Sequence, residues 1–274
     1  MSCGILFCVS GGEAVRVLCV GDVCAPAGCE AALKIIPELK REYGIGFTIV
    51  NGENSAAGNG ITPESAGLLF SAGADVITGG NHTLRRSEVF EMLDSNSCLL
   101  RPSNIEAEYG GGYTLCDLGR HRAAVINLSG QIYFDRVKPS NPFTAAEELL
   151  LRAKDDRANF IFVDFHAEAT SEKRAMGFFL DGRVSAVFGT HTHVQTADEQ
   201  ILPGGTGYIT DLGMTGVIDS VLGVRKDIIV NRLKSGGGSE KFMQAEGKCM
   251  LCGCIFDIDD KTGLAVSATR IYRE

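Results

Sequence analysis

Short apolar runs alternate with helix-compatible segments along most of the chain, and this alternation constrains the fold more than any other feature of the sequence. The runs are rich in β-branched residues and are bounded by Gly, Asn or Asp, which is typical of largely buried strands. They predict strands at residues 15–21, 47–51, 75–79, 122–128, 159–165, 185–189 and 206–211. Helices are expected near residues 27–43, 62–72, 84–95, 144–157, 171–180 and 225–235. The pattern indicates a layered α/β protein.

Local signals refine three of the helices and the C-terminal end. Thr62 followed by Pro63 predicts a helix N-cap with proline at the first helical position, and the spacing of Thr144 and Glu147 predicts a capping box. Pro37 is expected to kink the first helix. Two apolar segments on either side of "DKTG" predict an antiparallel hairpin near the C-terminus.

Length and composition bound the class of protein. With 274 residues, 45% of them hydrophobic, the chain can bury a large core, and one domain over residues 15–274 is favoured, preceded by an extension over residues 1–14. The formal charge of −8 argues against an extended nucleic-acid surface or an anionic-membrane surface, so small ligands are favoured as partners. Ten cysteines without a secretory signal indicate reduced thiols in a cytoplasmic protein rather than a disulfide framework.

Unusual polar residues follow the predicted strands, at the point where each strand ends. In α/β sheets, ligands bind at the carboxyl ends of the strands. The residues at these ends are Asp22, Glu53, Asn54, Asn81, His82, His166, His191 and His193. If residues 191–193 are extended, the two histidines of "HTH" point to the same side and can share an ion. The fifth histidine, His121, lies between two arginines at a strand start and is expected to play no part in such a site.

The donor types in this set indicate a metal site. Mixed oxygen and nitrogen donors suit Fe, Mn, Zn or Co better than Mg or Ca, which prefer oxygen alone. This many donors fit two ions better than one, with one carboxylate bridging them. Taken singly, each residue also has a structural reading, because strand-end Asp and Asn are commonly turn residues or helix caps and a lone His is commonly just hydrogen-bonded. Their recurrence at equivalent strand ends favours the metal site.

Five longer motifs carry a resemblance to a known family. "VGDV", "VNGENSAAGNGIT", "GADVITGGNHT", "DFHAEATSEKRAMG" and "VFGTHTHVQTAD" resemble the YmdB-like branch of bacterial metallophosphoesterases, in the calcineurin-like superfamily, and the similarity extends over about residues 15–272. The resemblance implies a four-layer αββα sandwich with two mixed sheets and a dinuclear centre of iron or manganese. It also implies a phosphodiesterase acting on cyclic nucleotides such as 2′,3′-cAMP, with 3′,5′-cAMP as a second candidate. A homo-oligomer is expected for this type of fold.

The same resemblance assigns roles by motif. One ion would be held by Asp22, Glu53, Asn54 and His193, and the other by Glu53, Asn81, His166 and His191. Glu53 would therefore be the bridging ligand, and His82 the catalytic proton donor. A hydroxide bridging the two ions would attack phosphorus while the acid protonates the leaving oxygen. From their proximity to the ligands in the sequence, rather than from the resemblance, Asp164, Glu168 and Asp211 are expected to accept hydrogen bonds from the ligand imidazoles. For Asp164 the alternative is a strand cap that faces the other way.

Two positions depart from the wider superfamily. Glu53 replaces the usual bridging Asp, a change typical of this branch. The usual first motif, D-x-H, is here Asp22-Val23-Cys24. Cys24 could be a soft ligand within reach of the first ion, but a small buried thiol is the favoured interpretation.

Two other functions stay open. The same metal centre could support a phosphomonoesterase acting on a small phosphorylated metabolite, and comparing a diester with a monoester substrate separates the two activities. The chain could instead be a regulatory protein whose metal site is structural. The complete ligand set together with His82 argues against that reading.

Overall fold

The computed structural model describes residues 14–134, 137–237 and 241–274. The predicted N-terminal extension, residues 1–14, lies outside these ranges except for Ala14, which begins the first strand. The division into an extension and one domain therefore stays a prediction. None of the helices in these ranges combines the length and hydropathy that a membrane span requires.

Two mixed sheets form the centre of the fold. The first contains, in spatial order, β2 (Asp22–Val23), β11 (Met214–Val217), β12 (Cys249–Asp259), β1 (Ala14–Val20), β3 (Phe47–Asn51) and β4 (Val76–Thr78), and β13 (Ala265–Arg273) also pairs with β12. The second contains β5 (Tyr113–Asp117), β6 (Arg122–Ser129), β7 (Phe160–His166), β8 (Ala186–Thr190), β10 (Gly207–Ile209) and β9 (Gln200–Ile201). Each sheet has parallel and antiparallel neighbours. The antiparallel pairing of β12 with β13 confirms the predicted C-terminal hairpin.

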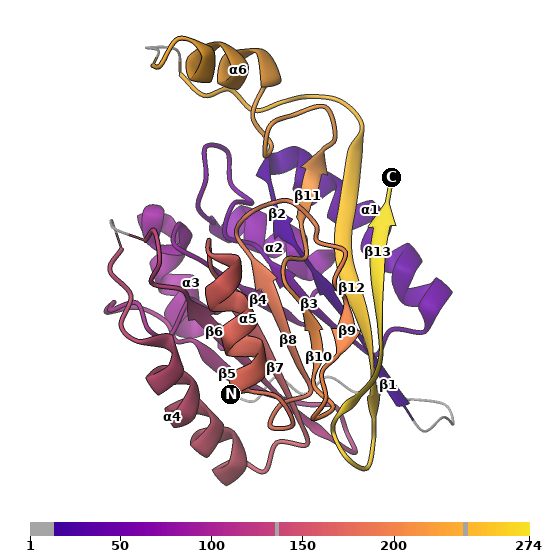
Figure 1. Ribbon diagram of the computed structural model, residues 1–274. Coiled ribbons are helices and arrows are strands. Elements are labelled where there is room, and N and C mark those ends of the chain that lie inside the picture. The colour runs from indigo at the N-terminus through magenta and orange to yellow at the C-terminus, as the bar shows by residue number, and fades with distance from the viewer. Residues whose placement is uncertain (1–13, 135–136, 238–240) are drawn as a thin grey trace.

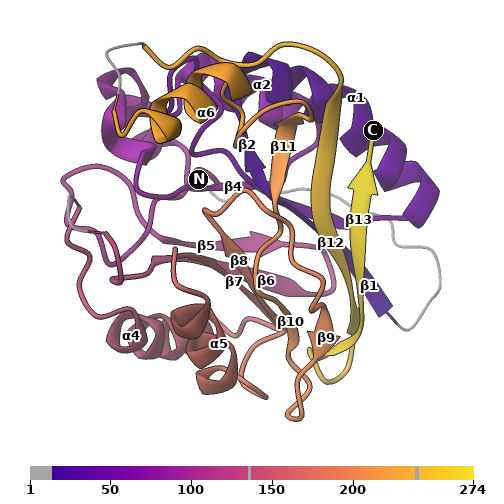
Figure 2. The same cartoon turned by 45° about the horizontal axis from the view of Figure 1, so that its top comes forward.

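Helices cover the outer face of each sheet, which gives four layers (Figures 1 and 2). The helices α1 (Ala25–Tyr43), α2 (Pro63–Ser71) and α3 (Phe90–Ser95) lie on the first sheet, and α4 (Pro142–Asp155) and α5 (Thr170–Phe179) on the second. Three buried hydrophobic clusters fill the spaces between the layers. In the middle cluster, the rings of Phe47 and Phe162 from opposite sheets lie 6.1 Å apart. This arrangement confirms the predicted αββα sandwich.

Local sequence signals predicted the start of α2 correctly but not the start of α4. Thr62 caps α2 as predicted, because its side chain accepts a hydrogen bond from the N–H of Ser65 at 3.2 Å. The predicted capping box at Thr144 is wrong. The helix α4 begins two residues earlier, at Pro142, because the side chain of Asn141 accepts hydrogen bonds from two of its first free N–H groups.

The predicted helix near residues 84–95 is interrupted. Two short 3₁₀ turns, η1 (Thr83–Arg85) and η2 (Ser87–Val89), precede α3. The backbone of Arg86 between them is extended, and its guanidinium donates hydrogen bonds to the carbonyls of Ala57 and Asn59. A helix through this position would remove those contacts with the loop after β3.

Candidate metal centre

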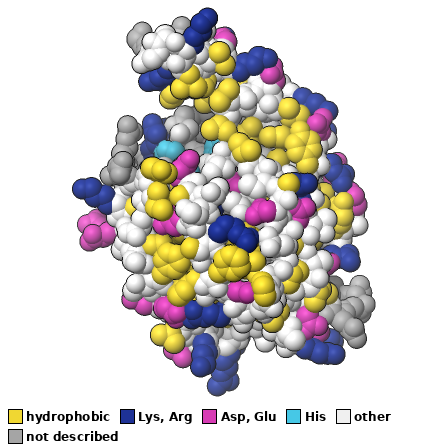
Figure 3. Space-filling view, viewed as in Figure 1, with side chains coloured by type: hydrophobic (Ala, Val, Ile, Leu, Met, Phe, Trp, Pro, Cys, Tyr) yellow, Lys and Arg dark blue, Asp and Glu magenta, His cyan; other side chains and the backbone are white. Residues whose placement is uncertain are grey.

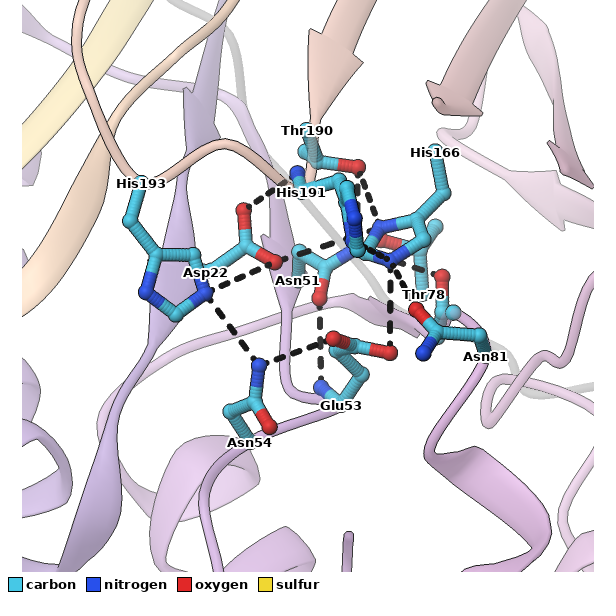
Figure 4. A network of polar contacts seen from close by, with 12 residues as sticks. Asp22, Asn51, Glu53, Asn54, Thr78, Asn81, His166, Thr190, His191 and His193 are labelled. Atoms are coloured by element: carbon cyan, nitrogen blue, oxygen red, sulfur yellow. Dashed lines mark hydrogen bonds and ion pairs between the residues drawn. The ribbon is translucent and has the colours of Figure 1, made fainter. Parts of the chain in front are cut away.

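The carboxyl ends of strands from both sheets meet at one place, and all eight predicted site residues lie there. The strands β1, β3 and β4 run parallel, as do β7 and β8, so their last residues point to the same edge. Figure 4 shows side chains from both sheets turned toward a common centre, among them Asp22, Glu53, Asn54, Asn81, His166, His191 and His193. His82 lies beside them, in contact with Glu53.

Four of the predicted ligands form a compact group. Ligand atoms of Glu53, His166 and His191 lie within 4.8 Å of one another. His166 Nε2 is 3.3 Å from Glu53 Oε2 and 3.0 Å from Asn81 Oδ1. His191 Nδ1 is 3.1 Å from the same His166 nitrogen. Carboxylate, carboxamide and imidazole donors thus converge on one small volume, as the second predicted ion requires.

The other predicted ligands lie on the opposite side of Glu53. His193 Nε2 is 3.8 Å from Asp22 Oδ1 and 3.2 Å from Asn54 Nδ2. The oxygens Asp22 Oδ1 and Asn54 Oδ1 are both buried and have no hydrogen-bond partner among the described residues. Orphaned buried oxygens are costly unless something else satisfies them. The orphaned Asp22 Oδ1 beside an imidazole nitrogen fits a cation, whereas Asn54 turns its Nδ2 rather than its Oδ1 toward His193 and Glu53. Asp22 and His193 are therefore suited to a metal in this half of the site as well.

The carboxylates and imidazoles of the site shift one another's pKa values. Burial raises the pKa of Asp22. Burial alone would also raise the pKa of Glu53, but the neighbouring His166 and His82 hold the pKa of this carboxyl well below its usual range. Burial opposes protonation of His166, yet the carboxylates of Glu53 and Asp22 raise the pKa of this imidazole to about 9. Burial and the adjacent His166 lower the pKa of His191 to about 3, which favours the neutral imidazole that can bind a metal.

Contacts with Glu53 fix the position of His82. Its backbone N–H donates to Glu53 Oε2 at 3.0 Å, and its Nδ1 is 3.2 Å from Glu53 Oε1. The imidazole is 27% exposed and lines the cavity described below. The contact at Nδ1 fixes the ring, and Nε2 lies 3.3 Å from Nδ2 of the predicted ligand Asn81.

The local backbone of the "HTH" segment differs from the prediction. The strand β8 ends at Thr190, and His191 and His193 have φ angles of 102° and 64° in the loop that follows. The extended conformation that would place both side chains on one side is therefore not adopted, although both imidazoles still reach the site. The carboxylate of Asp22 holds this loop, because Asp22 Oδ2 accepts the N–H of His191 at 3.0 Å.

A buried hydrogen-bond network beneath the ligands was not expected from the sequence. His166 Nδ1 is 2.9 Å from Thr190 Oγ1, which donates to Asp164 Oδ1 at 2.7 Å. Asp164 Oδ2 accepts from Asn51 Nδ2 at 3.0 Å and from the hydroxyl of Thr78. Asp164 therefore orients the imidazole of His166 through Thr190 rather than directly. The only sequence signal was the position of the three uncharged residues at strand ends.

The two other predicted partners of the imidazoles behave differently from each other. Glu168 Oε2 lies 3.1 Å from His191 Nε2, as predicted. Asp211 instead accepts a hydrogen bond from the ammonium of Lys173 at 2.6 Å and one from the backbone N–H of Thr192 at 3.2 Å. Lys173 also donates to the carbonyl of Thr190 at 2.8 Å, so this buried ion pair supports the backbone of the histidine loop.

Replacing Lys173 with Met is expected to lower the free energy of unfolding by about 3–5 kcal/mol, because it leaves the buried carboxylate of Asp211 without its cation. Urea unfolding monitored by circular dichroism measures the change. Arg183→Met, which breaks the exposed ion pair with Glu147, is the matched control and should cost much less. Equal losses in the two variants would contradict the supporting role of Lys173.

Cys24 is a buried thiol next to the site. Its Sγ lies 3.5 Å from His193 Nδ1 and 3.4 Å from the carbonyl oxygen of Asp22. Burial raises the pKa of the Cys24 thiol well above its ordinary value, which favours the protonated form. The favoured interpretation as a small buried thiol agrees with this environment.

A cavity of about 370 Å³ opens over the ligands. Glu53, Asn54, His82, His191 and His193 contribute to its floor and walls. Its remaining described lining residues are Cys24, Ala25, Gly58, Asn59, Glu168, Thr192, Leu222, Gly223, Val224, Phe242, Met243 and Gln244. Among the lining residues that the structure describes there is no Lys or Arg. Histidine side chains are visible from outside, below the arm that carries the last helix (Figure 3).

Relatives of the chain share this architecture over nearly its whole length. A 2′,3′-cyclic-nucleotide 2′-phosphodiesterase of Bacillus subtilis (strain 168) is 46% identical over 258 residues, which cover 94% of this chain and 96% of the relative. The crystal structure of a novel phosphatase from Mycoplasma pneumoniae has a TM-score of 0.88 at 33% identity and covers 95% of this chain and 94% of that chain. A hypothetical protein from Thermus thermophilus has a TM-score of 0.85 at 35% identity, covering 95% of this chain and 100% of that chain.

A 5′-nucleotidase from Staphylococcus aureus shares the fold alone, with a TM-score of 0.58 at 16% identity. The model of a family described as "YmdB-like protein" matches residues 18–271. These findings confirm the resemblance that the sequence motifs indicated. The chain belongs to the YmdB-like protein family.

Proposed function

We propose that this chain is a metal-dependent phosphodiesterase that hydrolyses cyclic nucleotides of the 2′,3′-cAMP type. The observation that carries the proposal is the convergence of the eight predicted residues on one site, where five of them line a cavity and the orphaned buried oxygen Asp22 Oδ1 fits a cation. The B. subtilis relative, named for this activity, supports the choice of substrate. The predicted homo-oligomer and the predicted cytoplasmic location stay predictions.

Two ions would be held in this centre, with iron or manganese as the metals. Asp22, Asn54 and His193 would bind one ion, and Asn81, His166 and His191 the other. Glu53 lies between the two groups and would serve both. When bound, such ions stabilise negative charge on a phosphate group and lower the pKa of coordinated water.

The chain's own residues would orient the substrate and supply the proton. Glu53 holds His82 through Nδ1, and Nε2, which lies 3.3 Å from Asn81 Nδ2, would exchange this contact for one with a bound phosphodiester. The departing ribose oxygen is a poor leaving group, and a proton delivered from Nε2 would remove its developing charge. Glu168, through its contact with His191 Nε2, would keep that ring turned toward the centre.

The charge of the cavity favours a diester over a monoester. A phosphomonoester carries nearly two negative charges at neutral pH, and a diester carries one. The described lining contains two carboxylates, those of Glu53 and Glu168, and none of its side chains is a Lys or Arg. Apart from the proposed ions, a second negative charge on the substrate would therefore meet no Lys or Arg among the described lining residues, which makes the phosphomonoesterase reading the weaker one.

Turnover of 2′,3′-cAMP by the purified chain, supplied with Mn²⁺ or Fe²⁺, tests the proposal. The expected product is adenosine 3′-monophosphate, identified by chromatography, and it should accumulate because the monoester is a poor substrate. Release of inorganic phosphate from the 3′-monophosphate at the same rate would favour the monoesterase. The proposal would be refuted if the metal-loaded protein hydrolysed neither 2′,3′-cAMP nor adenosine 3′-monophosphate.

A further inference from the structure

One wall of the cavity carries none of the predicted metal ligands and is mostly apolar. It is formed by two chain segments, residues 222–224 and 242–244. Phe242, Met243 and Leu222 are 59%, 53% and 47% exposed, although all three line the cavity. Large solvent-exposed apolar side chains next to a polar site are typical of a ligand-binding surface.

This wall is a built part of the fold and is joined to the metal centre. The two segments are paired through hydrogen bonds from Ala245 N–H to the carbonyl of Gly223 and from Arg225 N–H to that of Met243. Between them lies α6 (Lys226–Lys234), which projects from the body of the molecule (Figure 1). At its inner end, the carbonyl of Leu222 is 3.3 Å from Nδ1 of the predicted ligand His193.

Phe242 is the flat aromatic surface in the wall. The guanidinium of Arg232, on α6, lies over its ring at 4.6 Å from the centroid. Arg232 is not among the residues that line the cavity, whereas Phe242 is. Arg232 therefore covers part of the ring, while Phe242 stays 59% exposed and contributes to the cavity lining.

We infer that this wall binds the nucleobase of the substrate, with Phe242 as the stacking residue and Met243 and Leu222 beside it. The inference rests on the proposed function and adds a base-recognition surface to it. A phosphodiester held over the histidines must direct the rest of its sugar and base along the cavity. An uncharged aromatic base matches an apolar wall, and the volume of about 370 Å³ lies in the range of small-molecule sites.

The test compares a substrate that has a base with one that lacks it. Glycerol 1,2-cyclic phosphate contains the same five-membered cyclic diester as 2′,3′-cAMP but no base. The ratio of kcat/KM for 2′,3′-cAMP to that for glycerol 1,2-cyclic phosphate should fall about 5- to 100-fold in Phe242→Ala, the loss expected for one base stack. The change should lie in KM more than in kcat, and Phe242→Tyr should restore the ratio.

Leu233→Ala is the matched control, because Leu233 is an exposed apolar residue of α6 that does not line the cavity. An unchanged ratio in Phe242→Ala would overturn the inference. So would loss of an oligomer in Phe242→Ala, measured by light scattering, with the ratio retained, because the wall would then be an interface between copies of the chain.

A binding measurement separates this inference from the proposed function. If the wild-type chain hydrolyses neither cyclic phosphate, the proposed function fails. Calorimetric titration with adenosine 3′-monophosphate and with inorganic phosphate then tests the wall by itself. The ratio of the two affinities should fall about 5- to 100-fold in Phe242→Ala, and a wild-type chain that binds both ligands equally would refute the base site.

Discussion

Replacing His82 with Ala is expected to lower kcat for 2′,3′-cAMP by about 10²–10⁴-fold while the metal content per chain stays at the wild-type level. The imidazole contacts Glu53 through Nδ1 and lines the cavity, so its loss removes a proton donor but no predicted ligand. Metal content is measured by inductively coupled plasma mass spectrometry on the same samples that are assayed. His121→Ala is the control, because His121 packs on Phe160, away from the site.

The leaving group provides a second readout of the same role. Bis(p-nitrophenyl) phosphate releases a stable phenolate that needs no proton, so His82→Ala should be far less impaired with this diester than with 2′,3′-cAMP. Equal losses with both diesters would mean that His82 does not act as the acid. Loss of metal in parallel with activity would instead make His82 a ligand.

The location of the site could be predicted from the sequence because it depends on strand ends. The polar residues after β3, β4, β7 and β8 stand directly behind apolar runs, and parallel neighbours bring their last residues to one edge. The alternation of apolar runs with helical segments predicted a layered α/β protein, and the family resemblance added the four-layer sandwich. Four short strands, β2, β5, β9 and β11, were not predicted.

Features set by tertiary contacts could not be predicted. The φ angles of His191 and His193 depend on Asp22, which is distant in the sequence and accepts the N–H of His191. Thr190 links His166 to Asp164 only because β7 and β8 are neighbours in register. Phe134, whose ring centroid is 4.9 Å from that of His191, comes from a loop that carries no motif. In each case the partner is brought into contact by the tertiary fold rather than by local sequence.

Gly80 is required for a steric reason, not because its backbone has a positive φ angle. Its backbone is not left-handed, so alanine is compatible with the local conformation. A Cβ at this position would nevertheless lie well inside the van der Waals distance of Glu53 Oε2 and His166 Nε2. The glycine is needed because the backbone after β4 passes directly against two predicted ligands.

Gly80→Ala is therefore expected to lower metal affinity about 10- to 100-fold or more, because the added methyl must push apart a carboxylate and an imidazole that would bind the same ion. Metal content after dialysis and turnover of 2′,3′-cAMP should fall together. Overpacking should also lower the free energy of unfolding by roughly 1–3 kcal/mol. Gly67→Ala is the matched control, because no atom lies within 4 Å of a Cβ added at that position of α2. A Gly80→Ala chain that kept its metal and its activity would show that Glu53 and His166 stand farther apart in the metal-bound protein, so the ligand geometry proposed above would have to be abandoned.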